Sequence, residues 1–262
     1  MIEILDSRDT RVAEYSLLKA KEESTFTFVS DHEKTVLRLL HSKLKIKSIF
    51  GTPKYITKHS SLIHSKLTND SIFVASEKIF ESTIGFRVHQ GFMAVGYTPN
   101  LTNQLPSSDQ ILLCNSLVDS ENMGSILRTS ASFGLSSILL DEKCIHPYLR
   151  RSIRVSMGNI FSLSIQKSRN IQNDLQMYKA HGFKIISLSL PEKDGTTYHR
   201  KIGDFSFPEK FILVLGNESF GISEELKKVS DFFVYIPMYD GVDSLNVSHS
   251  LAVCLAFWRK GF

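Results

Sequence analysis

Residues 211–226, "FILVLGNESFGISEEL", pass from an apolar run through a polar loop with two glycines into a stretch that favours a helix. The run from Phe211 to Leu215 lacks the alternation of a half-buried strand, which predicts a strand covered on both faces. Ser223, followed by two glutamates, is typical of a helix start. The same succession recurs at residues 111–134 and 232–258, so the sequence predicts an α/β fold with a parallel sheet.

Six apolar runs are the expected strands of this sheet: "ILLC" (111–114), "SSILLD" (136–141), "FSLSIQ" (161–166), "FKIISLSL" (183–190), "FILVLG" (211–216) and "FFVYIPM" (232–238). The helix after the first run is expected to end at Gly134, with Arg128 outside an apolar stripe of Met123, Ile126, Leu127 and Ala131. The helix after the last run is expected to bury Val247, Leu251, Cys254 and Trp258.

The first hundred residues read as a separate, smaller α/β module. Short β-rich runs such as "IKSIFG" (46–51) and "GFMAVGY" (91–97) alternate with a helical pattern at 31–43, whose apolar positions are Val36, Leu37, Leu40 and Leu44. Prolines and many Asn, Ser and Thr residues then interrupt the pattern at 97–110. We therefore expect a first domain at 1–98, a linker at 99–110 and a second domain at 111–262.

Composition limits the class of protein. With 262 residues, of which 42% are hydrophobic and 22% charged, the chain can form real cores. It has no apolar stretch near the ~18 residues of a membrane helix and no leader pattern, so we expect a soluble cytoplasmic protein. Cys114, Cys144 and Cys254 are far apart in apolar surroundings, which favours buried thiols over disulfides or a zinc site.

Charge is concentrated in one segment of the first module. No Asp or Glu occurs from Lys34 to Asn69, although the net charge of the chain is only +4. A basic segment of this kind can follow a phosphate backbone, and its candidate RNA-binding residues are Lys43, Lys45, Lys47, Lys54 and Lys58. The alternative is a solvated face whose charge is balanced by acids elsewhere in the fold.

The polar residues of the three strand-to-helix loops are the candidates for chemistry, because loops at the carboxyl ends of parallel strands line the ligand crevice. Taken singly, Asn122, Glu218, Ser244 and Asn246 are equally explained as turn residues or helix caps. Gly216 and Gly221 do not form a phosphate-binding loop, since Ile222 stands where that loop needs Lys.

Taken together, the three loops resemble the motifs of the SpoU (TrmH) group of RNA ribose 2′-O-methyltransferases, in the SPOUT superfamily. The matching segments are Asn122-x-Gly124-x-x-x-Arg128, Leu215-Gly216-Asn217-Glu218-x-x-Gly221, and Ile236-Pro237-Met238 followed by Ser244-Leu245-Asn246. "VSMGN" (155–159) is similar to the Ser-x-Gly segment of the group, with Asn159 in place of a small residue. More faintly, the first hundred residues resemble the RNA-recognition module that often precedes the catalytic domain.

The resemblance implies a parallel-sheet domain with a trefoil knot, a homodimer, no metal, and S-adenosylmethionine as cofactor. First principles alone would not suggest a knot, because chains almost never thread loops. The implied cofactor-binding residues are Gly216, Asn217, Ile236, Met238 and Leu245. Gly216 is expected to be glycine because a side chain would obstruct the approach of a ligand to the backbone.

The implied reaction is methyl transfer to a ribose 2′-hydroxyl, a poor nucleophile that must lose its proton and be aligned. The resemblance makes Arg128 central, in some members of the family as the base itself. Since arginine stays protonated, we expect Arg128 instead to hold a phosphate and stabilise the developing alkoxide, with Glu218 orienting Arg128 or receiving the proton. Asn122, Ser244 and Asn246 are expected to position the ribose and the loops. A non-catalytic RNA-binding protein and a base-nitrogen methyltransferase remain alternatives, and ribosomal RNA is slightly favoured over transfer RNA.

Overall fold

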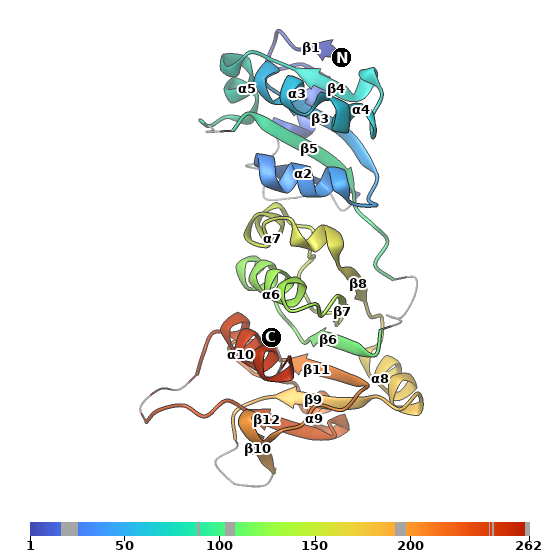
Figure 1. Ribbon diagram of the computed structural model, residues 1–262, viewed down its shortest axis with the longest axis vertical. Coiled ribbons are helices and arrows are strands. Elements are labelled where there is room, and N and C mark those ends of the chain that lie inside the picture. Colours follow the sequence, from blue (N-terminus) through green and yellow to red (C-terminus); the bar gives the residue numbers. More distant parts are fainter. Residues whose placement is uncertain are drawn as a thin grey trace. The chain divides into compact units, whose positions relative to one another are not determined.

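The computed structural model describes residues 1–16, 26–87, 90–102, 108–191, 198–240, 242 and 244–259. These form two compact units, each described by itself below (Figure 1). The first unit combines Met1–Pro99 with Pro147–Phe161, and the second combines Asn100–His146 with Ser162–Phe262.

The first unit is built on a mixed five-stranded sheet in the order β1-β4-β3-β5-β2. Its strands are β1 (Ile2–Glu3), β2 (Thr27–Asp31), β3 (Ile46–Gly51), β4 (Ile72–Val74) and β5 (Phe92–Tyr97). Its α-helices are α1 (Ala13–Ser16), α2 (Glu33–His41), α3 (Pro53–Lys58), α4 (Ser60–His64), α5 (Glu77–Ile84) and α7 (Arg150–Val155). β5 is antiparallel to both β2 and β3, whereas β4 is parallel to both β3 and β1.

Helix α2 and the aromatic core show how the sequence produces this unit. α2 buries Val36, Leu39 and Leu40. The expectation was wrong for Leu44, which lies beyond the end of the helix. In the hydrophobic core of the unit, the ring of Phe50 stacks on the ring of Phe80, with the two ring centroids 4.6 Å apart. Such aromatic contacts stabilise the sheet beyond the burial of their area.

The segment Pro147–Phe161, which contains α7, packs on the first unit although it lies in sequence between strands of the second. Phe28 on β2 contacts Tyr148 and Phe161 with ring centroids 5.2 and 5.5 Å apart. Arg150 forms an ion pair with Asp31, whose side chain is only 8% exposed. Burial opposes ionisation of Asp31, but His32 and Arg150 outweigh it and lower its pKa.

The second unit is built on a seven-stranded sheet in the order β10-β12-β9-β11-β6-β7-β8, and every pair in it is parallel. Its strands are β6 (Gln110–Cys114), β7 (Ser137–Leu140), β8 (Ser164–Lys167), β9 (Lys184–Leu188), β10 (His199–Lys201), β11 (Phe211–Leu215) and β12 (Phe232–Tyr235). Its α-helices are α6 (Ser120–Ser132), α8 (Ile171–Ala180), α9 (Glu224–Val229) and α10 (Val247–Trp258). The predicted parallel sheet is confirmed. Short 3₁₀ turns complete the two units at Thr10–Val12, Asn69–Ser71, Asn159–Ser162 and Ile202–Asp204.

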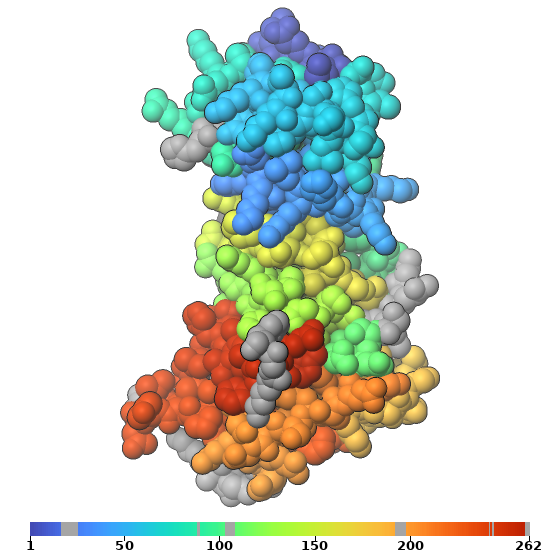
Figure 2. All heavy atoms as spheres, viewed as in Figure 1, coloured from blue at the N-terminus to red at the C-terminus, as the bar shows by residue number. Residues whose placement is uncertain are grey.

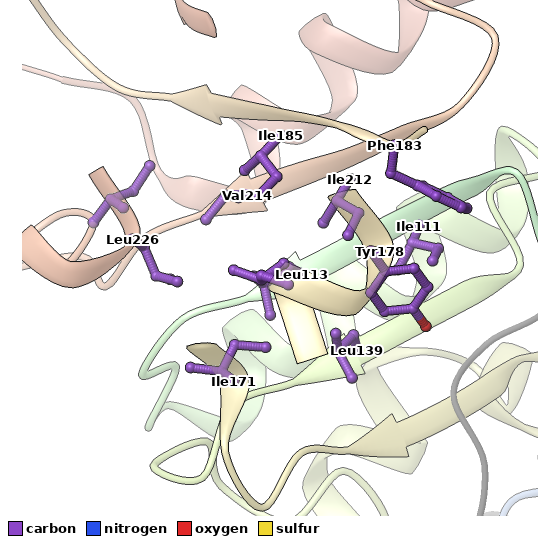
Figure 3. Close-up of a cluster of buried hydrophobic side chains, with 12 residues drawn as sticks. Ile111, Leu113, Leu139, Ile171, Tyr178, Phe183, Ile185, Ile212, Val214 and Leu226 are labelled. Atoms are coloured by element: carbon purple, nitrogen blue, oxygen red, sulfur yellow. The ribbon is translucent and has the colours of Figure 1, made fainter. Parts of the chain in front are cut away.

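The continuous apolar runs are explained by cores on both faces of this sheet. Ile111 and Leu113 join a cluster on the face covered by α8 and α9 (Figure 3). The alternate residue Leu112 is equally buried, at 0% exposed. A strand buried on both faces needs apolar residues at every position, which is why no alternation is seen.

Helices α6 and α10 lie against each other, and their surfaces adjoin in the space-filling view (Figure 2). α6 buries Met123, Ile126 and Leu127 as predicted, while Ala131 is half-buried. α10 buries Leu251 and Cys254, whereas Val247 and Trp258, expected in the core, are half-buried. At the end of α10, Arg259 donates from Nε to the carbonyl of Phe133, 2.9 Å away, and Gly134 ends α6 with a φ of +73°.

The three cysteines are buried and free, and burial raises the pKa of each thiol, to about 12 for Cys144 and Cys254. Within the described ranges, no group of His, Cys, Asp and Glu side chains has the arrangement of a metal site. None of the helices described is long and apolar enough to cross a membrane.

Candidate active site

The three motif loops follow β6, β11 and β12 and meet at one edge of the second sheet. β11 lies between β6 and β9, and β9 lies between β11 and β12, so these four strands are neighbours. All run parallel, and their carboxyl ends therefore face the same way. Residues about 100 positions apart in sequence are brought together here.

The loop after β11 holds its own shape through Asn217. The backbones of Asn217 and Gly221 exchange two hydrogen bonds of 2.9 Å, and the Asn217 side-chain oxygen accepts from the amide nitrogen of Ser219 at 2.8 Å. The Asn217 amide group donates to the carbonyl of Ser116 at 2.8 Å, which ties this loop to the loop after β6. A Cβ on Gly216 would lie 2.3 Å from the carbonyl carbon of Gly221. A side chain at position 216 would clash with the backbone of the loop itself. Glycine is therefore required here by the fold of the loop, and not only by the approach of a ligand, which was the expected reason.

The loop after β6 is organised by a buried acid that sequence reasoning missed. Asp141, 2% exposed, accepts hydrogen bonds from the side chain of Asn115 at 2.7 Å and the backbone of Ser116 at 2.8 Å. Its other oxygen accepts from the amide of Cys144 at 2.9 Å. Asn115 in turn accepts from the amide of Ser223 at 2.8 Å. The position of Asp141, directly after an apolar strand, was the available signal.

Asn122 connects all three motif loops. Its amide nitrogen donates to Oε1 of Glu218 at 2.6 Å, and its oxygen accepts from the amide nitrogen of Asn246 at 2.9 Å. Asn246 also caps α10, accepting from the backbone of Ser248 at 2.9 Å. Asn246 is therefore both the cap of a helix and a member of the hydrogen-bond network that joins the motif loops. Within the described residues, Oε2 of Glu218 has no hydrogen-bond partner.

A cavity of about 530 Å³ opens beside this network, between the ends of β9, β11 and β12. All of the expected cofactor-binding residues line it, as do three of the expected catalytic residues: Gly216, Asn217, Ile236, Met238, Leu245, Glu218, Ser244 and Asn246. Apolar side chains and loop backbone on its walls suit a nucleoside, and its size suits one small-molecule cofactor. The residues present thus fit S-adenosylmethionine.

Arg128 lies outside this arrangement. It is exposed on α6, it does not line the cavity, and within the described residues its guanidinium has no hydrogen-bond or ion-pair partner. The expected pairing of Arg128 with Glu218 is not present in the single chain.

The segment 109–256 matches the model of the SpoU rRNA Methylase family, which covers more than half of the chain. The chain belongs to the SpoU rRNA Methylase family. The match confirms the resemblance inferred from the three motifs.

Relatives of this SpoU chain extend the likeness over its whole length. The 23S rRNA (guanosine(2553)-2'-O)-methyltransferase RlmP of Bacillus subtilis is 26% identical over 99% of this chain and 100% of that protein. An uncharacterized tRNA/rRNA methyltransferase of Mycoplasma pneumoniae is 28% identical over 93% of this chain and 100% of that protein. The AdoMet-bound rRNA methyltransferase of Sinorhizobium meliloti shares the fold, with a TM-score of 0.83 at 19% identity over 98% of this chain and 97% of that one.

The lysines of the basic segment differ in how far they are free to bind RNA. Lys47 pairs with Glu14 at 2.5 Å, and Lys58 pairs with Glu33 at 2.7 Å, which lowers the pKa of Glu33 and raises that of Lys58. Lys54 lies 5.6 Å from the centroid of the Tyr55 ring. Lys43 and Lys45 are exposed without an acidic partner among the described residues. The alternative of a solvated face whose charge is balanced by acids therefore holds for two of the five lysines, Lys47 and Lys58.

Proposed function

We propose that this SpoU chain transfers a methyl group from S-adenosylmethionine to a ribose 2′-hydroxyl of ribosomal RNA. The hydrogen bonds of Asn122 to Glu218 and Asn246 carry the proposal, because they join the three motif loops beside a cavity of suitable size. Family membership and the full-length likeness to RlmP, named for 2'-O methylation of 23S rRNA, support the ribose acceptor and the ribosomal substrate.

The cofactor supplies an electrophilic methyl group when it is bound. The backbones of Gly216 and Asn217 and the side chains of Ile236, Met238 and Leu245 hold it in the cavity. The loop after β11 is fixed by its own hydrogen bonds, so little ordering is required on binding.

Glu218 is our candidate for the residue that receives the proton of the 2′-hydroxyl. Asn122 occupies Oε1, and Oε2 has no partner among the described residues. A carboxylate with one oxygen anchored and the other available is suited to general base catalysis. Ser244, exposed at the cavity, is available to hold the ribose.

The reaction is tested by incubating the protein with labelled S-adenosylmethionine and a 23S ribosomal RNA transcript, then digesting the RNA and identifying the methylated nucleoside by mass spectrometry. Ribose methylation is expected. A methyl group on a base nitrogen, or cofactor binding without transfer to any RNA, would contradict the proposal.

The first prediction concerns Arg128, whose guanidinium is expected to bind phosphate and stabilise charge on the acceptor oxygen. Arg128→Ala should retain the cofactor affinity measured by calorimetry and lose methyl transfer by on the order of a hundredfold or more. Arg154→Ala, which removes an exposed arginine from α7, is the control. Near-wild-type turnover by Arg128→Ala would exclude the role.

We further propose a homodimer in which Arg128 of one protomer completes the site of its partner. The support is that Arg128 is exposed and outside the cavity of its own chain, while the rest of the motif network is assembled. Light scattering should give a dimer. Mixing inactive Arg128→Ala and Glu218→Gln chains should restore about a quarter of the wild-type activity, because half of a random mixture is heterodimer with one intact site. No recovery after verified subunit exchange would place Arg128 in cis.

The remaining expectations are proposals of the same kind. The expected second domain, 111–262, carries the reaction and contains the trefoil knot, which family membership supports, although its segment Pro147–Phe161 packs on the first unit. The first domain, 1–98, contacts RNA through its basic segment, with Lys43 and Lys45 the freest contacts, and 99–110 links the two. We place the enzyme in the cytoplasm, where ribosomal RNA is modified in bacteria such as those of its relatives.

A further inference from the structure

A second hollow, of about 400 Å³, lies along the outer strand β10 of the catalytic sheet. It is lined by Tyr198, His199, Arg200, Lys201, Asp204 and Tyr235. β10 pairs only with β12 among the described strands and is the outermost strand at that side of the sheet (Figure 1). None of the three motifs includes its basic residues.

The hollow adjoins the cofactor cavity. Tyr235, at the end of β12, lines both. Ser189, which lines the cofactor cavity, is hydrogen-bonded through its hydroxyl to Nε2 of His199 at 3.2 Å. Whatever occupies the hollow is therefore next to the reaction site of the same chain.

Its chemistry combines stacking surfaces with positive charge. Tyr198 is 79% exposed. The guanidinium of Arg200 lies 5.9 Å from the Tyr198 ring centroid and 5.2 Å from that of Phe232, so it is within cation–π distance of two aromatic rings. No carboxylate in the described part of the chain forms an ion pair with Arg200 or Lys201, although Asp204 is nearby.

We infer that this hollow binds an unpaired nucleotide of the substrate RNA next to the one that is methylated. Exposed aromatic rings stack on unpaired bases, and Arg or Lys side chains beside them bind the phosphate. The guanidinium of Arg200 has cation–π contacts but no ion pair among the described residues, so its N–H donors remain available to a phosphate. The inference rests on the proposed RNA methyltransferase function and assigns part of its substrate recognition to β10.

The alternative is that these side chains only protect an edge strand, since exposed lysines and other charges on such strands prevent pairing with other chains. That role requires no RNA. It predicts that neutral variants aggregate or lose stability while their affinity for RNA is unchanged.

The test compares binding of a 23S ribosomal RNA transcript and of single-stranded oligouridylate at several salt concentrations. The double variant Arg200→Ala, Lys201→Ala should weaken binding of both and reduce the steepness of log K against log salt by about 0.7 for each lost phosphate contact. Tyr198→Ala should weaken binding roughly tenfold, and Tyr198→Trp should restore it. Lys184→Ala, which removes an exposed lysine at the first residue of β9 and outside the hollow, is the matched control.

Cofactor affinity should stay at the wild-type value in all of these variants, because none of the substituted residues lines the cofactor cavity. Unchanged RNA affinity and salt dependence in the double variant would overturn the inference, whether or not the variant aggregates. Since binding is measured without turnover, absence of methyl transfer by the wild type would refute the proposed function without deciding the role of the hollow.

Discussion

At the residue scale, the side-chain amide of Asn122 has a fixed orientation because its two ends have different partners. Its nitrogen must donate to the carboxylate of Glu218 and its oxygen must accept from Asn246. A flipped amide would place an oxygen against a carboxylate. Asn122 thereby fixes Glu218 relative to the start of α10, and a site that needs a carboxylate within hydrogen-bond reach of a hydroxyl depends on that fixation.

Asn122→Asp should disturb the site without changing its shape. A second carboxylate beside Glu218 replaces the donated hydrogen bond by repulsion between like charges. Turnover should therefore fall by on the order of a hundredfold, because the carboxylate of Glu218 is no longer held in place. Asn173→Asp, the same change at an exposed position of α8, is the control. Turnover close to that of the wild type would mean that Asn122 does not act through Glu218.

At the scale of elements, α7 is attached to β2 by a mostly buried ion pair. Arg150 reaches Asp31 from Nε at 3.0 Å, and the Arg150 guanidinium also lies 5.5 Å from the Phe86 ring centroid. Removing one partner leaves the other charge buried, which is the costly way to break such a pair. The ion pair therefore holds the segment Pro147–Phe161 on the first unit together with the aromatic contacts of Phe28.

Arg150→Met should lower the free energy of unfolding at pH 7 by about 3 kcal/mol. Folding lowers the pKa of the Asp31 carboxyl. The stability that the ion pair contributes is therefore fully present above the pKa of ~3.9 in the unfolded chain, and it is lost as the pH falls through the lower pKa of the folded protein. The difference from wild type should thus shrink below about pH 4 in denaturant titrations. Arg154→Met, an exposed position of α7, should show no such dependence. An equal loss at pH 3 and pH 7 would contradict this account.

At the scale of the whole molecule, the proposed knot has a mechanical consequence. A chain of 262 residues pulled from both ends should extend to ~940 Å if it is unknotted. A knotted chain should stop short of this length, because the knot tightens and remains. If the second pulling handle is attached at Lys228 instead of the C-terminus, the C-terminal segment that forms the knot lies outside the stretched part of the chain. That part should then extend to the full length expected for its number of residues. Full extension from both termini in an optical trap would exclude the knot.

Sequence patterning predicted what depends on local burial and could not predict what depends on distant partners. The strands were recognised because both faces of runs such as Ile111–Cys114 are buried. β10 was missed because it is short, charged and at an edge. The carboxylates of Glu14 and Glu33, which pair with Lys47 and Lys58, lie 33 and 25 positions away in sequence. No local sequence pattern reveals pairs of this kind.

The motif residues were recognised by resemblance. The structure places most of the candidate site residues around one cavity, joins Asn122 to them through Glu218 and Asn246, and leaves Arg128 outside. The residues that brace the loops, Asn115 and Asp141, were missed because a polar residue after a strand reads as an ordinary turn. The exposure of Arg128 was visible in its place outside the apolar stripe. Its proposed role in the site of a partner protomer was not visible, since a second chain leaves no periodic signal in the first.

Because the thiols are buried, the rate at which each cysteine reacts reports how often the surrounding part of the molecule opens. Only the thiolate attacks alkylating reagents, and Cys114 in β6 and Cys254 in α10 are both inaccessible with raised pKa values. Modification of either cysteine therefore records a transient exposure of its own element. If the terminal helix peels away before the strands separate, Cys254 reacts first; if they open as a single cooperative unit, both react at one rate.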